Sequence, residues 1–186
     1  MNKNILLALG GNLPSRIGDP KETLAAALAR LNGAGIALLA VSRFYETPCF
    51  PAGAGPDYVN AAAKVSSDLA PRDLLRRLHE IEAEFGRKRD TRWGMRTLDI
   101  DLIAMGDLVL PDATTQRSWQ TLPLEEQVRA TPEQLILPHP RLQDRAFVIG
   151  PMMDVAPLWK HPLTGKTVAE IHAQLPKQDI AALKSL

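Results

Sequence analysis

Leu98-Asp99-Ile100-Asp101-Leu102-Ile103 alternates apolar and acidic residues and then becomes wholly apolar, and this stretch decides the fold. A period of two is typical of a β-strand with one face in the core. It places Asp99 and Asp101 on the same face of a sheet, whereas a helix would set them roughly 200° apart. The sequence therefore predicts a strand that presents a pair of carboxylates.

The segments before this strand predict five further elements. Residues 71–85 have apolar side chains at helical spacing, with Gly86 as the expected helix end. Earlier in the chain we expect strands over 5–9, 36–45 and 59–65 and a helix over 21–31. The order strand, helix, strand, strand, helix, strand is typical of an α+β ferredoxin-like sandwich, with helices on one face of an antiparallel sheet.

The rest of the chain is less regular. Residues 111–134 are polar and contain prolines, which predicts an irregular insertion that acts as a lid or a mobile segment. An apolar run follows at 146–149, and one or two peripheral helices are expected from Val168 onward. A length of 186 residues with 45% hydrophobic residues predicts one core and a single domain over 1–186.

Composition narrows the function. A net charge of +1 gives no overall field for gripping a nucleic-acid backbone, so any basic function must be local. The single cysteine, Cys49, rules out an intramolecular disulfide and a cysteine-rich zinc site. No apolar run approaches a membrane span, and the first ten residues are too short for a signal peptide. We therefore expect a cytoplasmic protein without membrane or nucleic-acid partners. A monomer is expected as well.

A basic loop leads directly into the carboxylate strand. Its cations outnumber its one acid, Asp90, and are Arg87, Lys88, Arg89, Arg92 and Arg96. Guanidinium groups bind phosphate oxygens bidentately. Magnesium is usually held by one or two protein carboxylates together with substrate phosphates. The loop and the strand together predict a nucleotide–magnesium site.

Simpler explanations exist for each part of this site. Two acids on a strand can serve only to discourage edge pairing, and a run of charges is usually a solvated surface. Trp93 either caps the core or stacks on a planar ligand. Gly165-Lys166-Thr167 resembles the end of a P-loop, but Lys160 stands where that motif needs glycine.

Several motifs, in one order along most of the chain, resemble the hydroxymethyl-dihydropterin pyrophosphokinase family. They are Ala8-Leu9-Gly10-x-Asn12-Leu13, Phe44-Tyr45-x-Thr47-Pro48, Pro56-Asp57-Tyr58-x-Asn60-Ala61, Arg92-Trp93-Gly94-x-Arg96-Thr97-Leu98-Asp99-Ile100-Asp101, Leu137-Pro138-His139-Pro140-Arg141 and Arg145-Ala146-Phe147. The resemblance implies a ferredoxin-like fold and a step of folate biosynthesis. In that step an intact pyrophosphoryl group moves from ATP to the hydroxymethyl oxygen of a reduced pterin, and AMP is released.

The same resemblance implies roles for individual residues. Asp99 and Asp101 would hold magnesium, with two ions expected, and would act in catalysis with Arg87 and Arg96. The implied ATP-binding residues are Glu82, Arg87, Arg89, Arg92, Trp93, Arg96, Ile100, His139 and Arg145. The implied pterin-binding residues are Thr47, Pro48, Phe50, Tyr58, Asn60, Trp93 and Phe147.

Elementary chemistry fits these roles but leaves alternatives open. A flat heterocycle is held well between aromatic faces, and an amide such as Asn60 offers both a donor and an acceptor. Without the resemblance, ordinary core packing is the favoured interpretation of Tyr58 and Phe147. His139, between two prolines, either moves a proton or serves as a fixed hydrogen-bond donor.

The chain departs from the family pattern at three places. Gly11 stands where serine is usual, Cys49 stands where proline is frequent, and the connection at 111–134, which contains Trp119, is much longer. We expect Gly11 to free a loop and the insertion to affect closure of the site.

Two other functions also fit part of the pattern. Paired aspartates with arginines suit a two-metal phosphodiesterase or nuclease, which would need further acidic ligands. A noncatalytic nucleic-acid module would use Trp93 for stacking and the arginines for phosphates.

Overall fold

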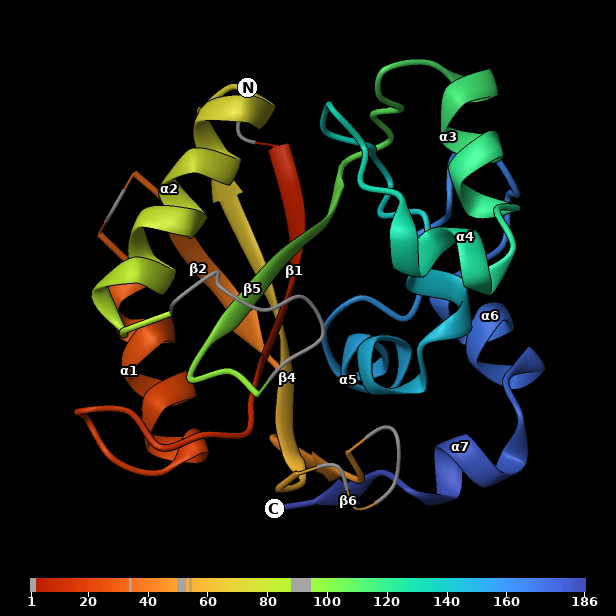
Figure 1. The fold of residues 1–186 in the computed structure, drawn as a ribbon. Helices are drawn as coiled ribbons and strands as arrows, with labels where there is room; N and C mark the ends of the chain where they lie inside the picture. The colour runs from red at the N-terminus through yellow and green to blue at the C-terminus, as the bar shows by residue number, and fades with distance from the viewer. Residues whose placement is uncertain (1–2, 34, 50–52, 54, 88–94) are drawn as a thin grey trace.

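An antiparallel sheet forms the centre of the molecule (Figure 1). The computed structural model describes residues 3–33, 35–49, 53, 55–87 and 95–186. In this part of the chain the strands are β1 (Lys3–Gly11), β2 (Ala37–Val41), β3 (Tyr45–Thr47), β4 (Tyr58–Ser67), β5 (Asp99–Met105) and β6 (Lys184–Ser185). Their order is β5-β1-β4-β3-β6, and β2 also pairs with β4. The expected antiparallel α+β sheet is confirmed.

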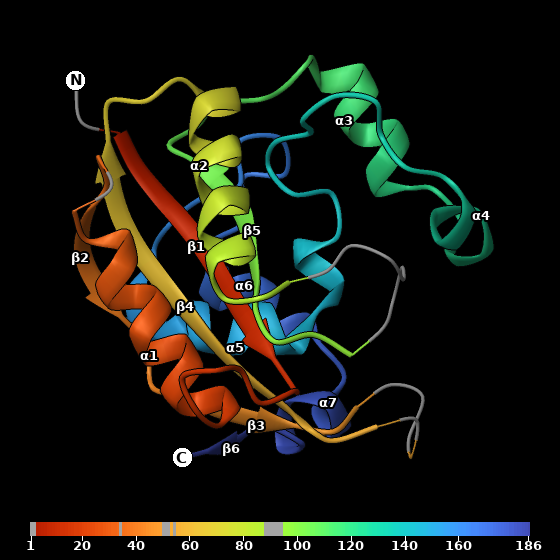
Figure 2. The ribbon, with the colours of Figure 1, turned by 60° about the vertical axis from the view of Figure 1, so that its left-hand side comes forward.

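Two long helices cover the first face of the sheet (Figure 2). They are α1 (Pro20–Leu31) and α2 (Pro71–Glu84), each beginning with a proline that suits the first helical turn. The buried side chains between these helices and the sheet include Ile5, Leu7, Leu9, Leu24, Leu28, Leu31, Leu74, Leu78, Ile81, Ile100 and Leu102. The residues at odd positions of β1 therefore face this core, as the strand period requires.

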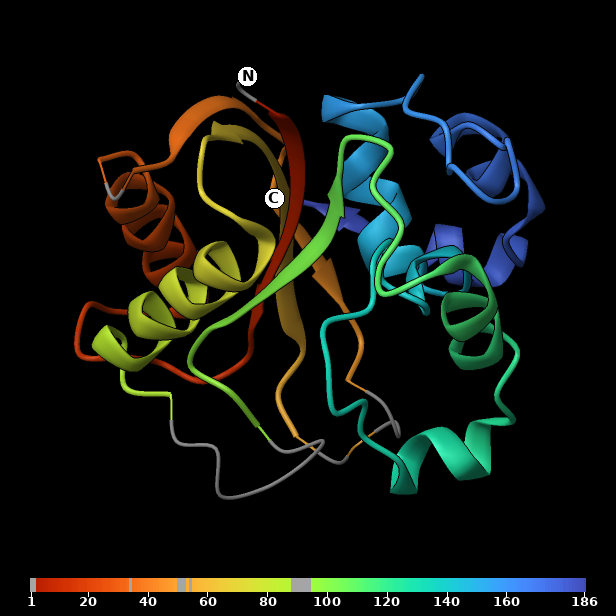
Figure 3. The same cartoon turned by 90° about the horizontal axis from the view of Figure 1, so that it is seen from above.

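A second helical layer covers the opposite face, so the expectation of helices on one face only is wrong. It contains α5 (Ala146–Val155), α6 (Val168–Gln174) and α7 (Lys177–Ala181), and Figure 3 shows the sheet between the two layers. Leu6 and Ile103 pack here against Ile149 and Met152 in a second core. The reason lies in the strands, because their alternate positions are also apolar and need cover on this face too.

The expected single strand over 36–45 is interrupted. It forms two strands, β2 and β3. Between them, Ser42 bonds to Ala62 of β4 through its amide and its hydroxyl, in place of regular strand pairing. The Ser42 amide donates to the Ala62 carbonyl at 2.9 Å, and the Ser42 hydroxyl accepts from the Ala62 amide at 2.8 Å. The Arg43 amide donates to Asp154 Oδ2 at 3.1 Å, which turns the backbone away from β4.

The insertion at 111–134 contains helices, so its expected irregularity is wrong. They are α3 (Ala113–Gln120) and α4 (Leu124–Arg129). The Asp112 side chain caps α3 by accepting from the Thr115 amide at 2.9 Å, a local signal that outweighs the polar composition. At the base of the insertion Leu110 and Leu137 exchange backbone hydrogen bonds of 2.9 and 3.1 Å. The insertion thus leaves and re-enters the domain at one point.

No helix in the described ranges is both long enough and apolar enough to cross a membrane.

Candidate active site

The register of three neighbouring strands builds the floor of a site. Asn60 on β4 lies opposite Gly10 on β1, and Gly10 lies opposite Asp99 on β5. Two residues further along β1, Ala8 lies opposite Asp101. Because side chains alternate along a strand, Asp99 and Asp101 share a face, as the sequence predicted. At these positions the central strand, β1, carries only Gly10 and Ala8, and these small residues leave room above the floor.

A cleft of about 460 Å³ opens on this floor, next to the start of α5. It brings together most of the residues expected from the sequence: Thr47, Tyr58, Asn60, Arg87, Arg96, Asp99, Asp101, His139, Arg145 and Phe147. They come from β3, β4 and β5, from the segments just after α2 and just before β5, and from residues 139–147, which lead into α5 and begin it. A single cavity therefore joins the carboxylate pair, the arginines and the aromatic residues.

Gly10 is required by the close approach of Asn60. A Cβ atom added at Gly10 would lie 2.8 Å from Asn60 Oδ1, closer than normal packing allows. The Asn60 amide is in turn oriented by its Nδ2, which donates to Thr47 Oγ1 at 2.7 Å. Glycine at this position therefore lets the amide stay aimed along the floor.

Gly10→Ala is expected to displace the Asn60 side chain and so to weaken recognition of a heterocyclic ligand. A lost pair of hydrogen bonds should raise the KM for that ligand about 10-fold. The Kd for ATP, measured on the same protein by calorimetry, serves as the internal control and should stay unchanged. An unchanged KM for the heterocycle would show that Asn60 takes no part in its binding.

Asp99 lies between two arginines. Arg87 Nη1 is 2.5 Å from Asp99 Oδ1, and Arg96 Nη1 forms an ion pair with Asp99 Oδ2. Asp101 has a longer contact, with Arg145 Nη1 3.8 Å from Asp101 Oδ2. Since Arg145 is largely surrounded by protein, burial lowers its pKa, and Asp101 opposes that effect. The carboxylates and guanidinium groups thus face each other across the cleft.

Glu82 holds this arrangement from behind. Its carboxylate is almost fully buried, accepts from the Ile100 amide at 2.7 Å and forms an ion pair with Arg87. Neither Glu82 nor Ile100 lines the cleft, and Ile100 packs into the first core. Glu82 is thereby placed to fix both the start of β5 and the direction of Arg87.

His139 is held in one tautomer. Its amide donates to the Ile103 carbonyl at 2.8 Å, and its Nδ1 accepts from the Arg141 amide at 3.1 Å. The hydrogen of the neutral ring is therefore on Nε2. Burial, with Arg145 nearby, lowers the pKa of His139 to about 3. Of the two open roles, the geometry favours a neutral donor, because Nδ1 already accepts a hydrogen bond and Nε2 carries the hydrogen.

This pKa implies a stability change with pH. The unfolded chain binds a proton at His139 below pH 6.5, while the native state does not until about pH 3. Stability should therefore fall as the pH drops through this window, by about 3 kcal/mol at pH 4. Urea unfolding at pH 7 and pH 4 should show a smaller loss in His139→Gln than in the wild type. The same loss in both proteins would contradict the depressed pKa, and His172→Gln is the matched control.

The two aromatic residues of the cleft are both partly exposed. Phe147 is 41% exposed, and the Arg145 Cζ lies 5.7 Å from the centroid of its ring. Tyr58 is half-buried, and burial raises its pKa. Both rings therefore line the cleft and are accessible from it, so they remain candidates for contacting a flat ligand.

Some of the predicted residues are not gathered in the cleft. Pro48 is exposed and does not line it. Four predicted residues lie outside the described residues: Phe50, Arg89, Arg92 and Trp93.

Residues missed from the sequence also line the cleft. Arg141 is the main one, and it stands two positions after His139 in a motif that was recognised. The feature that could have identified Arg141 is its positive charge close to His139, a predicted nucleotide contact. Ala8 and Gly10 were missed as floor residues because only the strand register assigns them there.

Two of the three departures from the family pattern, Gly11 and Cys49, have structural explanations. A Cβ atom at Gly11 would lie 2.5 Å from the Thr97 carbonyl oxygen, so this glycine permits a close backbone approach to the loop before β5. The expectation that it frees a loop is thus wrong, since the Asn12 amide also donates to the Arg96 carbonyl at 2.9 Å. Cys49 is buried, and its thiol donates to the Gly55 carbonyl at 3.0 Å.

The donor set suits magnesium better than zinc. Asp99 and Asp101 place two hard oxygen ligands on one face of the cleft, with room and cations for phosphates beside them. Within the described ranges, no group of three or more His, Cys, Asp or Glu side chains gathers into a complete protein cage.

Comparisons with known proteins identify relatives of this chain. The model of the 7,8-dihydro-6-hydroxymethylpterin-pyrophosphokinase family matches residues 6–157. A 2-amino-4-hydroxy-6-hydroxymethyldihydropteridine pyrophosphokinase from Pseudomonas aeruginosa is 37% identical over 185 residues, with 98% of each chain covered. The Synechocystis protein of the same name is 37% identical over 171 residues, covering 91% of this chain and 75% of its own length.

Solved structures share the fold. An HPPK-DHPS crystallised with substrates gives a TM-score of 0.67 at 12% identity over 100% of this chain, and the Plasmodium falciparum HPPK-DHPS triple mutant gives 0.65 at 14% over 94%. The present chain spans only 46% and 44% of those two chains.

Proposed function

Because the chain belongs to the 7,8-dihydro-6-hydroxymethylpterin-pyrophosphokinase family and is an ATP-dependent diphosphokinase of folate biosynthesis, we propose that the cleft over β1, β4 and β5 holds both substrates. The observation that carries the proposal is the register that aligns Asn60, Gly10 and Asp99 across three strands. It places the Asn60 amide, which we propose binds the pterin ring, and the Asp99 carboxylate on the two strands that flank β1. Among the functions considered from the sequence, family membership selects the kinase.

Asp99 and Asp101 are the proposed magnesium ligands, for two ions. When bound, magnesium neutralises phosphate charge and polarises the transferred group. Asp99 is engaged by Arg87 and Arg96 in the described structure, so nucleotide phosphates are expected to draw these guanidinium groups toward themselves. This exchange would free the carboxylate for the metal.

The proposed phosphate-binding groups are the arginines of the cleft and the Nε2–H of His139. Arg141 joins Arg87, Arg96 and Arg145 in this set, since all four line the cavity. In phosphoryl-type transfer most of the barrier reduction comes from positioning and charge neutralisation. The buried Glu82 keeps Arg87 directed at the phosphates through their ion pair. Arg89, Arg92 and Trp93 remain proposed nucleotide contacts.

The pterin is proposed to lie between Tyr58 and Phe147. Asn60, oriented by Thr47, would read the amide-like edge of the ring. The hydroxymethyl oxygen would then face Asp101 and attack the β-phosphorus of ATP. A bond forms between this oxygen and the β-phosphorus, the bond from the β-phosphorus to the bridging oxygen of the α-phosphate breaks, and AMP leaves. The hydroxyl proton passes to solvent or to phosphate, since His139 has no free acceptor nitrogen.

Product analysis tests this function. The protein is incubated with ATP, magnesium and 6-hydroxymethyl-7,8-dihydropterin, and the products are separated by chromatography. AMP and the pterin diphosphate should appear in equal amounts. ADP with a pterin monophosphate would contradict pyrophosphoryl transfer.

A monomer is proposed as the active unit, as expected from the sequence. Activity should be proportional to protein concentration down to the nanomolar range.

A further inference from the structure

One helix of the insertion sends a buried side chain into the domain. Of the eight residues of α3, all of which the structure describes, only Gln116 is buried, and its side chain is fully enclosed. Glutamine is mostly found at protein surfaces, and a buried amide normally has hydrogen-bond partners. Gln116 Nε2 donates to the Pro138 carbonyl at 3.1 Å. The insertion therefore contacts the segment that carries His139 through a specific bond.

The peptide group between Pro138 and His139 is held at both ends. Its carbonyl accepts from Gln116, and its N–H donates to the Ile103 carbonyl on β5 at 2.8 Å. A peptide group is planar, so two bonds at its opposite edges fix its orientation. The position of the His139 Cα atom follows from that plane. The ring is then set by Nδ1, which accepts from the Arg141 amide at 3.1 Å.

The helix α3 is itself anchored to the same part of the domain. Leu110, just before the helix, pairs with Leu137 through backbone bonds of 2.9 and 3.1 Å. Asp112 then caps the helix by accepting from the Thr115 amide at 2.9 Å, and the Asp112 carbonyl accepts from the Gln116 amide at 3.0 Å. The helix that carries Gln116 thus starts beside the segment that Gln116 contacts, which fixes where the Gln116 side chain lies.

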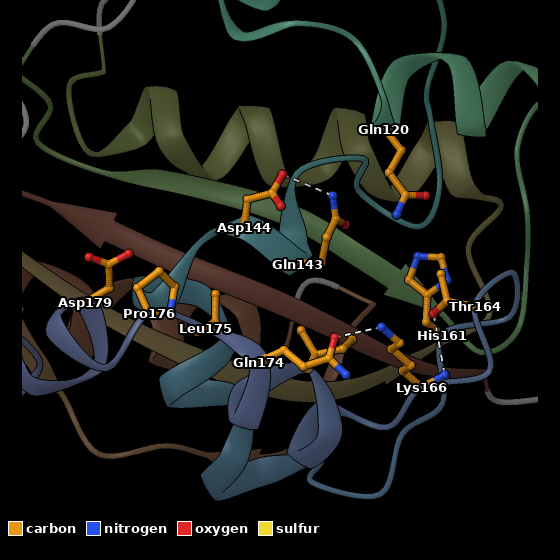
Figure 4. Close-up of a pocket in the computed structure, with 11 residues that line it drawn as sticks. Gln120, Gln143, Asp144, His161, Thr164, Lys166, Gln174, Leu175, Pro176 and Asp179 are labelled. Atoms are coloured by element: carbon orange, nitrogen blue, oxygen red, sulfur yellow. Dashed lines mark hydrogen bonds between the residues drawn. The ribbon is translucent and has the colours of Figure 1, made fainter.

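The other glutamine of α3 lies at the end of the helix and faces a cavity (Figure 4). Gln120 lines this cavity, of about 400 Å³, together with Gln143 and Asp144 of the short 3-10 helix η1 (Leu142–Asp144). The Gln116 amide is instead enclosed and bonded to the Pro138 carbonyl. The two glutamines therefore form a matched pair for substitution.

The Gln116 amide is a poor contact for stability alone. Its Oε1 is buried and has no hydrogen-bond partner among the described residues. An unmatched buried acceptor opposes the gain from the bond that Nε2 makes. Methionine at this position would remove the unmatched acceptor together with the donor, and would leave the Pro138 carbonyl without its bond to Gln116. These two effects oppose each other, so the net change in stability should be small.

We propose that Gln116 is a positioning residue for His139. By holding the Pro138 carbonyl, it keeps the Nε2–H of His139 directed at the nucleotide phosphates, and it gives the insertion a part in the use of ATP. This inference rests on the proposed role of His139 as a phosphate-binding donor. Gln116 itself is enclosed and does not line the cleft, so it acts on the substrates only through His139.

The variant Gln116→Met tests the proposal, with Gln120→Met as the matched control. Loss of the bond should lower kcat/KM for ATP about 10-fold, because small displacements of a positioned group are costly. The KM for the pterin should be unchanged, because the proposed pterin contacts do not involve His139. The midpoint of thermal unfolding should stay within about 3 °C of the wild type. Gln120→Met should match the wild type in all three measurements.

A double-mutant cycle shows whether Gln116 acts through His139. The effect of Gln116→Met is measured again in a protein that already carries His139→Ala. If Gln116 only positions the imidazole, its replacement should change kcat/KM for ATP less than about twofold there. A general weakening of the fold would instead lower kcat/KM by the same factor in both backgrounds. If Gln116→Met fails to fold, Gln116→Asn replaces it, because its shorter side chain cannot bring the amide to the Pro138 carbonyl.

Three results would overturn the proposal. They are wild-type kcat/KM for ATP in Gln116→Met, an equal loss in the two backgrounds, and a fall in the unfolding midpoint of more than about 3 °C in Gln116→Met. Wild-type activity in His139→Ala would contradict the proposed phosphate-binding role of His139 as well. A defective His139→Ala beside a normal Gln116→Met would contradict only the positioning by Gln116.

Discussion

Asp101→Asn is expected to lower kcat by about 10³-fold or more. The substitution keeps the shape of the side chain but removes the charge that we propose holds magnesium. Asp101 is partly exposed, and the ion pair that it makes among the described residues, with Arg145, is a loose contact of 3.8 Å, so the fold should not depend on it. The measurement is steady-state kinetics at several magnesium concentrations, with thermal unfolding as the check on folding.

The matched control for this variant is Asp107→Asn. Asp107 is exposed in the turn that follows β5, and it does not line the cleft. It should keep wild-type kcat. Full activity in Asp101→Asn would remove this carboxylate from the catalytic account. Loss of activity together with loss of folding would instead assign Asp101 a structural role.

Arg96→Ala is expected to lower kcat by about 10³-fold, with a smaller change in the KM for the pterin. A cation that neutralises transition-state charge contributes mainly to kcat. Arg96 also pairs with Asp99, and its carbonyl accepts from the Asn12 and Leu13 amides. The alanine variant keeps those backbone bonds, so the loss reports on the guanidinium group. Rapid-quench measurement of a single turnover separates the chemical step from product release.

Arg72→Ala is the control for this second variant, because Arg72 is exposed on α2 and does not line the cleft. Its kcat should be unchanged. A defect in Arg96→Ala confined to the KM for ATP would indicate ground-state binding only, and would contradict a role in the transition state.

The local part of the site was readable from the sequence. A period of two was enough to place Asp99 and Asp101 on one face, because that inference needs only the geometry of a single strand. Which face of the sheet carries the two carboxylates could not be predicted from the sequence. Both faces of β1 and β5 are apolar, and only the packed structure shows that the carboxylates belong to the α5 side.

The register between β1 and its neighbours β4 and β5 could not be predicted from the sequence either. Gly10 pairs with Asn60 and Asp99, which are distant from it in the chain, and no local pattern around Gly10 points to either of them. Likewise, Glu82 was read as a nucleotide contact, whereas its burial and its bond to the Ile100 amide indicate a supporting position. A pattern gives the type of a residue and its local spacing, while its partners depend on how distant segments meet.

The helices that were missed have physical reasons too. α5 contains Gly150 and Pro151 and is apolar on most sides, so it lacks an amphipathic period. In the insertion, α3 is polar and short, and the Asp112 cap was its clearest signal. Gln116 on α3 is fully buried and donates to the Pro138 carbonyl at 3.1 Å, next to His139. Such a contact between an insertion and a catalytic segment leaves no trace in local spacing.

The most direct test of the central claim follows the β-phosphorus of ATP. ATP carrying a radioactive label at the β-position is incubated with the protein, magnesium and 6-hydroxymethyl-7,8-dihydropterin. If the cleft aligns the hydroxymethyl oxygen with the β-phosphorus, all transferred label should be found in the pterin product and the nucleotide product should be unlabelled AMP. Labelled ADP beside an unlabelled pterin phosphate would contradict the account.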